Sequence, residues 1–168
     1  MSTIIGVLGA GVTGSRVVEQ LSLSGVQRIA VCDKVLARAQ RLAALHNNSM
    51  CQVIAVAQSD IAQCDVVVLA CGAAHAGLAA QFIRTGVHVV SLSDDVSDCM
   101  NLLALNEQAT DMNAVVLVGA ASSPGVTGLL LRSVAKNFDV VDEVHVALHG
   151  TGGPDCARQH HQIGRAHV

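Results

Sequence analysis

Residues 3–14 read Thr-Ile-Ile-Gly-Val-Leu-Gly-Ala-Gly-Val-Thr-Gly, and the fold is decided in this stretch. Its first half, Thr3–Leu8, is a short apolar run typical of a buried strand. Its second half carries a Gly-x-Gly-x-x-Gly pattern at Gly9, Gly11 and Gly14, directly before an amphipathic helical stretch. In a strand-to-helix turn, the first glycine permits the tight bend and the second lets the backbone approach a pyrophosphate. The third glycine lets the helix pack closely on the strand, so the pattern predicts a dinucleotide-binding turn.

Apolar runs continue to alternate with helical stretches down the chain. We expect strands at 28–32, 51–56, 65–70, 88–92 and 115–118, and helices at 12–24, 36–43, 76–85, 102–112 and 125–137. Strands that are apolar throughout and separated by helices indicate a parallel sheet covered on both faces. The prediction is therefore an α/β fold, a Rossmann-type doubly wound parallel sheet with helices on both faces, over residues 1–140.

Ligands of such sheets bind beyond the carboxyl ends of the strands. The helix that follows the glycine turn offers free N–H groups and the positive end of its dipole to phosphates. FAD would also suit this turn, but strand-helix alternation through six strands favours a nicotinamide dinucleotide, NAD or NADP. The residues expected to hold the pyrophosphate are Gly9, Ala10, Gly11, Val12 and Thr13.

Asp33 follows the second expected strand, 19 residues after Gly14, near the spacing of the acid that reads the adenosine ribose. A carboxylate bonds ribose hydroxyls and repels a 2′-phosphate, so Asp33 favours NAD over NADP. Lys34, Arg38 and Arg41 could reverse this preference by pairing with that phosphate, or could simply form a solvated helix face. The alternative for Asp33 is a cap on the next helix, beside a glycine turn that serves packing alone.

Further candidates follow the later strands. The backbone of Cys71 and Gly72, after the fourth strand, is expected beside the cofactor. His75 could shuttle a proton there or could merely begin a helix. Asp94 and Asp95, after the fifth strand, are expected to cap a helix rather than to act as bases. No residue is assigned a catalytic role.

The composition argues against several partner classes. Ten Lys and Arg against thirteen Asp and Glu give a net charge of -3, and aromatic residues make up 1%, so no nucleic acid is expected. The longest apolar stretch, 66–80, is interrupted by polar and glycine residues and is shorter than the ~20 residues of a membrane span. We see no signal peptide and no Cys-x-x-Cys among six cysteines, which indicates a reduced, cytoplasmic protein.

The end of the chain has a different pattern. Glu143–Leu148 alternates apolar and polar residues, which predicts an antiparallel strand and the start of a substrate or dimerisation domain over 141–162. Residues 163–168, Ile-Gly-Arg-Ala-His-Val, are what a sequence similar to the start of a sequencing adapter would encode, so we expect a non-native tail on a truncated chain. No metal site is expected, because the spacing of the nearby candidates fits none. These candidates are His145, His149, Cys156, His160 and His161.

Three stretches resemble the NAD(P)-binding domain of saccharopine dehydrogenase and saccharopine reductase-like proteins. They are GVLGAGVTG at 6–14, DVVVLACGAAHAGLAAQFIRTGVHVVSLSDD at 65–95 and VVLVGAASSPGVTGLLLRSVAK at 115–136. The resemblance implies an NAD(P)-dependent oxidoreductase that transfers a hydride between nicotinamide and an amino-acid-like or carbonyl substrate, possible as a homo-oligomer. Ser123 stands where saccharopine reductase-like enzymes tend to carry Asp, so only the cofactor roles are carried over. The alternative is a non-catalytic dinucleotide-binding module that senses redox state.

Overall fold

The structure, a computed structural model, describes residues 2–147, and its centre is a parallel sheet of six strands in the order β3-β2-β1-β4-β5-β6. The strands are β1 (Ile4–Leu8), β2 (Arg28–Cys32), β3 (Gln52–Ala55), β4 (Val66–Leu69), β5 (His88–Ser91) and β6 (Val116–Leu117). The helices are α1 (Val12–Leu23), α2 (Leu36–His46), α3 (Ala76–Ile83), α4 (Val96–Leu103), α5 (Asn106–Asp111) and α6 (Val126–Ala135), with a 3₁₀ turn η1 (Ile61–Gln63). The predicted doubly wound Rossmann sheet is thus confirmed.

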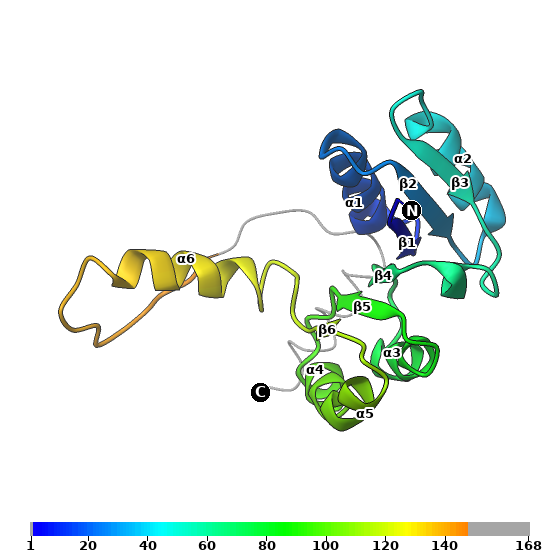
Figure 1. The fold of residues 1–168 in the computed structure, drawn as a ribbon. Helices are drawn as coiled ribbons and strands as arrows, with labels where there is room; N and C mark the ends of the chain where they lie inside the picture. Colours follow the sequence, from blue (N-terminus) through cyan, green and yellow to red (C-terminus); the bar gives the residue numbers. More distant parts are fainter. Residues whose placement is uncertain (1, 148–168) are drawn as a thin grey trace.

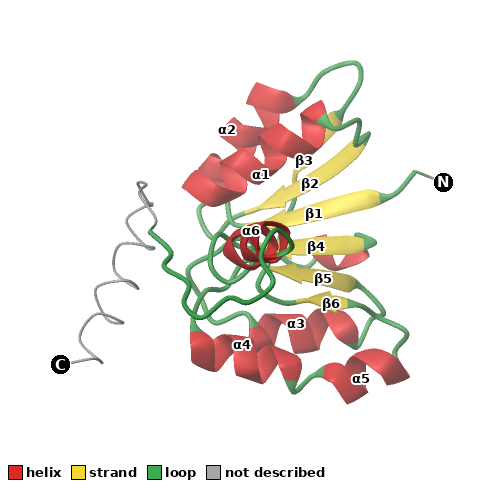
Figure 2. Ribbon diagram, turned by 90° about the vertical axis from the view of Figure 1, so that its left-hand side faces the viewer, coloured by secondary structure: helices red, strands yellow, loops and turns green. Residues whose placement is uncertain are grey.

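Both faces of the sheet are buried, because successive side chains of a strand point to opposite faces. Val7 of β1 belongs to a cluster with Val18 of α1 and Leu42 of α2. The next residue, Leu8, belongs to the other cluster, with Phe82 of α3. Figure 2 shows α1 and α2 on one side of the sheet and α3, α4 and α5 on the other. This explains why the strands read as continuous apolar runs.

The winding of the sheet reverses at β1. This strand pairs with β2 through Leu8 and Cys32 and with β4 through Leu8 and Leu69. The chain adds β2 and β3 on one side of β1 before it crosses to add β4, β5 and β6 on the other (Figure 1). In such sheets a crevice opens beyond the carboxyl ends of the strands at the reversal, which here follows Leu8.

One predicted helix, 102–112, is two helices in the structure, so this prediction is wrong. The first, α4, begins earlier, because the side chain of Asp95 accepts a hydrogen bond from the Asp98 N–H at 2.8 Å and caps it. At its end, Leu105 N–H bonds the Leu102 carbonyl, three residues back, and this tighter turn separates α4 from α5. The prediction that Asp95 is a helix cap is confirmed.

The strand predicted at Glu143–Leu148 is also wrong, since residues 143–147 form no strand. An alternating segment needs a neighbouring strand to hydrogen-bond with, and no described strand lies beside it. It follows α6, which has no buried residue and extends away from the sheet in Figure 1. Residues 148–168, including the tail predicted at 163–168, lie outside the described part of the chain. Within 2–147, no helix is long and apolar enough to cross a membrane.

Candidate functional site

A long cleft follows the carboxyl edge of the sheet. One end is lined by the glycine turn after β1 and by Asp33 after β2. The other end is lined by the loop from Cys71 to Ala73 after β4, by Ser93 after β5 and by the loop 120–122 after β6. The cleft therefore runs across the point where the winding of the sheet reverses, where ligands of this architecture bind.

Two positions of the turn must be glycine, because neighbouring backbone leaves no room for a side chain. Gly9 has a φ of +114°, and a Cβ atom there would overlap the carbonyl of Ala70. A Cβ atom on Gly14 would overlap the carbonyl oxygen of Gly9. Neither position admits a side chain, since both are filled by neighbouring backbone, and this closeness brings α1 directly onto the end of β1.

Gly11 is different, because nothing in the fold requires a glycine there. Its φ of -80° and ψ of -165° are extended backbone that any residue adopts, and no atom lies within 4 Å of a Cβ built on it. The open space lies at the start of α1, where the first N–H groups have no acceptor within the helix. The first turn also holds no acidic residue. Space, N–H donors and a helix dipole together fit the pyrophosphate of a dinucleotide.

Asp33 joins the second strand to the glycine turn. Its Oδ2 accepts a hydrogen bond from the Ala10 N–H at 2.8 Å, and its Oδ1 accepts one from the Val35 N–H at 2.8 Å. The bond to Val35 closes a turn just before α2 and does not cap that helix, whose N-cap residue is Val35 and which no side chain caps. The bond to Ala10 was not foreseen from the sequence. An ionised carboxylate accepts roughly four hydrogen bonds, so Asp33 retains acceptor capacity for ribose hydroxyls.

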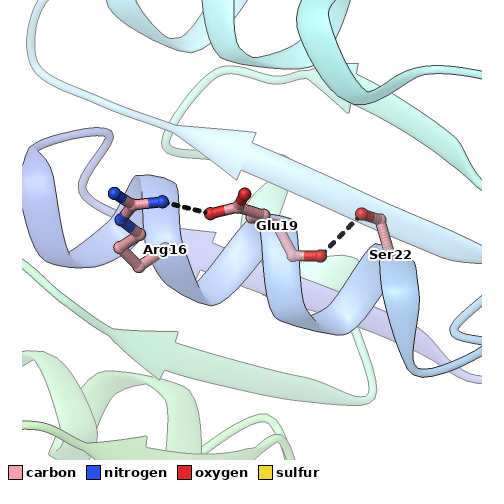
Figure 3. Close-up of polar contacts among 3 residues, drawn as sticks. All are labelled: Arg16, Glu19 and Ser22. Atoms are coloured by element: carbon pink, nitrogen blue, oxygen red, sulfur yellow. Dashed lines mark hydrogen bonds and ion pairs between the residues drawn. The ribbon is translucent and has the colours of Figure 1, made fainter.

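Four basic residues line the same end of the cleft: Arg16, Lys34, Arg38 and Arg41. Figure 3 shows that Arg16 lies along α1 toward Glu19, whose carboxylate is 2.7 Å from the guanidinium. Glu19 in turn accepts a hydrogen bond on its backbone carbonyl from the Ser22 hydroxyl at 2.7 Å. The Arg16 side chain is 76% exposed, so water screens this pair and it adds little to stability.

At the far end of the cleft, His75 is buried and both its ring nitrogens are engaged. Nε2 donates to the Cys71 carbonyl at 3.0 Å, because a carbonyl oxygen can only accept, and Nδ1 lies 2.8 Å from the Ser91 hydroxyl. Asp98 bonds the backbone N–H of His75 and not its ring. Ser91, His75 and Asp98 therefore do not form a hydrolytic triad, in which the carboxylate orients the imidazole. Of the two interpretations of His75, this geometry favours the structural one.

Cys71 has a neighbour that sequence reasoning missed. Burial opposes ionisation of its thiol, but the His75 side chain and the Ala73 backbone outweigh this effect and lower the pKa of Cys71. Burial likewise opposes the charge on His75, but the interactions with Cys71 prevail and raise the pKa of His75. The signal in the sequence was the four-residue spacing from Cys71 to His75, which places the two at the ends of one short loop.

Within residues 2–147, no three His, Cys, Asp or Glu side chains converge as a metal site would require. His145 lies 3.2 Å from Glu143 on an exposed segment. The other candidates, His149, Cys156, His160 and His161, lie outside the described residues.

Residues 2–92 match the family model of shikimate/quinate 5-dehydrogenase. No curated protein matches the chain. Among solved structures, quinate dehydrogenase from Corynebacterium glutamicum, in complex with NAD, is 24% identical with a TM-score of 0.55, over 71% of this chain and 45% of that one. Saccharopine dehydrogenase (L-Glu forming) from Saccharomyces cerevisiae is 22% identical with a TM-score of 0.65, over 81% of this chain and 31% of that one.

The WlbA dehydrogenase from Bordetella pertussis, in complex with NADH and UDP-GlcNAcA, is 16% identical with a TM-score of 0.59, over 82% of this chain and 42% of that one. At these identities the likeness to the solved structures is one of fold. The chain spans less than half the length of each of these three.

Proposed function

The chain belongs to the shikimate/quinate 5-dehydrogenase family and forms the NAD(P)-binding domain of a dehydrogenase, and from this premise we propose how its cleft holds the cofactor. The pyrophosphate lies at the N-terminus of α1, against the backbone of Gly9–Thr13. The backbone of Cys71 and Gly72 borders the nicotinamide half. The observation that carries this proposal is the open space at Gly11, which the fold itself does not require.

We further propose that the adenosine ribose lies against Asp33 and Lys34, with NAD preferred over NADP. The support is the Asp33 carboxylate, which keeps acceptor capacity for ribose hydroxyls after its bonds to Ala10 and Val35. A 2′-phosphate there would meet this negative charge. Arg38 and Arg41, which line the same end, oppose the preference.

For the whole protein, we propose hydride transfer between nicotinamide and a small carbonyl or hydroxy compound or an amino-acid-like one. The family match supports the first substrate class, and the resemblance to saccharopine dehydrogenase in three stretches supports the second. The dinucleotide, when bound, supplies or accepts the hydride. The residues of this chain bind it and orient it along the cleft. A domain boundary near 140, with a substrate domain that begins over 141–162, belongs to the same proposal.

Titration calorimetry with NAD, NADH, NADP and NADPH tests the binding site. Gly11→Val should weaken binding by roughly 100-fold or more, because a side chain then occupies the space of the phosphates and their charge-assisted hydrogen bonds are lost. The thermal unfolding midpoint should change little, since no atom lies within 4 Å of the new Cβ and the fold loses only the preference of the N-cap position for glycine.

Gly128→Val is the matched control. Gly128 lies in α6, also has open space around it and does not line the cleft. The Gly128→Val variant should therefore bind the dinucleotides with the affinity of the wild type. Equal affinity in Gly11→Val and the wild type would overturn the site. The redox-sensor alternative shares the site. It would be favoured if the full-length protein bound NADH but neither oxidised shikimate, quinate or saccharopine nor reduced the products of their oxidation.

A further inference from the structure

A buried carboxylate on α4 holds the start of a different helix. Asp98 is 6% exposed, and each of its oxygens accepts a backbone N–H from the first turn of α3. The His75 N–H bonds Oδ2 at 2.9 Å, and the Ala76 N–H bonds Oδ1 at 3.0 Å. A helix start is ordinarily capped by the side chain just before it. Here that residue is His75, whose side chain makes no cap, so the cap comes from Asp98 on another element.

The loop before α3 is fixed at its other end by the same group of residues. The His75 ring donates to the Cys71 carbonyl and contacts the Ser91 hydroxyl, which also accepts the Ser93 N–H at 3.2 Å. Among the described residues, no buried side-chain nitrogen or oxygen lacks a hydrogen-bond partner. One connected hydrogen-bond network thereby joins the ends of β4 and β5 to the starts of α3 and α4.

This set of bonds lies behind one half of the cleft only. The loop from Cys71 to Ala73 and Ser93 line the cleft at the end away from Asp33. The glycine turn and Asp33 have hydrogen bonds of their own, from the Ala10 N–H to Asp33 and from the Gly9 N–H to the Cys32 carbonyl. A loosened Cys71–His75 loop would therefore leave the adenosine and pyrophosphate end intact.

We propose that Asp98 is a positioning residue for the nicotinamide half of the bound dinucleotide, acting through the Cys71–His75 loop. This inference rests on the proposed function of the cleft. A buried ionised carboxylate is costly unless it is fully hydrogen-bonded, and a local cap at position 75 would start α3 without that cost. The remote cap adds a fixed relation between the loop that borders the cleft and the end of β5.

The test compares the affinity for NADH with that for ADP, which carries the adenosine and two phosphates but no nicotinamide. In Asp98→Asn, one carboxylate oxygen becomes an NH₂ group that faces an N–H donor, so one of the two bonds from the backbone of α3 is lost. We expect NADH to bind roughly tenfold more weakly, the loss of about one such bond, and ADP to bind as in the wild type. The fluorescence of bound NADH should shift toward that of free NADH, because the nicotinamide becomes more exposed to water.

Asp95→Asn is the matched control. It makes the same change of charge on the same helix, Asn caps helices as well as Asp does, and Asp95 touches neither the loop nor the cleft. Both affinities should stay at the wild-type value. If Asp98→Asn fails to fold, Ser91→Ala serves instead, since it removes the partner of the His75 ring and should weaken NADH binding selectively in the same way.

Equal weakening of NADH and ADP would overturn the proposal, because it would indicate a general loss of structure. Unchanged NADH affinity in the folded variant would overturn it as well. If the wild type binds neither NADH nor ADP, the proposed function fails first, and this inference fails with it.

Discussion

Gly11 and Gly14 stand three residues apart in one turn, yet they answer to different requirements. A Cβ atom on Gly14 would overlap a backbone oxygen, which cannot rotate away, whereas one on Gly11 would meet nothing within 4 Å. Gly14→Ala should therefore lower the free energy of unfolding by about 3 kcal/mol or more, and Gly11→Ala by about 0.5 kcal/mol at most. Urea unfolding followed by circular dichroism measures both. Equal losses in the two variants would contradict the distinction between a packing glycine and a ligand glycine.

Asp33 holds the Ala10 N–H and, by our proposal, also binds the adenosine ribose. Asp33→Ser removes the negative charge at the proposed ribose site, and we expect the binding free energy of NADP relative to that of NAD to become more favourable by about 1–3 kcal/mol. It also weakens the hold on the Ala10 N–H, so the affinity for both cofactors should fall somewhat. Calorimetry on both proteins gives this relative free energy. A wild type that already binds NADP more tightly would mean that Lys34, Arg38 or Arg41 determines the preference instead.

Cys71 should be the most reactive of the described cysteines. Its pKa is lowered by His75 and Ala73 against the effect of burial, whereas burial raises the pKa of the other four. Because the thiolate is the nucleophile, Cys71 should keep reacting with iodoacetamide as the pH falls below 9, when the others slow. Peptide mass spectrometry at neutral pH should find Cys71 alkylated first, and NAD should protect it. Earlier labelling of the half-buried Cys99 would contradict this.

Asp98 should also make the fold sensitive to acid. Burial would raise the pKa of Asp98, but hydrogen bonds from His75, Ser93 and Ala76 outweigh burial and lower it below the ordinary 3.8. The folded state thus releases this proton more readily than the unfolded one. The resulting stability is present above the unfolded pKa and is lost as the pH falls through the folded one.

Between about pH 5 and pH 3, the free energy of unfolding should fall more steeply in the wild type than in Asp98→Asn, which has no carboxyl group to titrate. Urea unfolding at each pH measures the two slopes. Parallel slopes in the wild type and Asp98→Asn would show that Asp98 titrates alike in both states.

At the scale of elements, prediction from sequence succeeded where the determinants are local. The strand at 28–32 was predicted with both of its ends correct. An apolar run of this kind indicates a buried strand whichever elements pack against it. The helix predicted at 102–112 failed, because apolar spacing does not reveal a tight turn at Leu105. The strand predicted at 143–148 failed for the opposite reason: its pattern was right, but a strand forms only with a partner.

The candidate site divides in the same way. The glycine turn could be predicted, because its requirements fall within six consecutive residues. The cap on α3 could not be predicted, because Asp98 lies 23 residues along the chain from His75, whose N–H group donates a hydrogen bond to it. Ser91 and His75, 16 residues apart, meet only because β4 and β5 are neighbours in the sheet. Side-chain bonds between elements depend on the tertiary fold, which no local pattern contains.

At the scale of the whole molecule, the sheet and α6 contribute very differently to the free energy of unfolding. Leu69 of β4 is fully buried between the layers, whereas Leu130 of α6 is 60% exposed and no residue of α6 is buried. Removing a buried leucine side chain loses its transfer free energy and leaves a cavity, whereas an exposed leucine loses neither. The stability of the fold should therefore depend on the first residue and not on the second.

Leu69→Ala should lower the free energy of unfolding by about 2–5 kcal/mol, and Leu130→Ala by less than about 0.5 kcal/mol, since alanine also favours the helix. The chain has no Trp and no Tyr, so urea unfolding is followed by far-ultraviolet circular dichroism. Leu130→Ala should also leave NADH affinity unchanged, because Leu130 does not line the cleft. A loss of stability in Leu130→Ala that approaches that of Leu69→Ala would mean that α6 packs against the rest of the chain in solution. The cleft would then have a further wall beyond the loop 120–122.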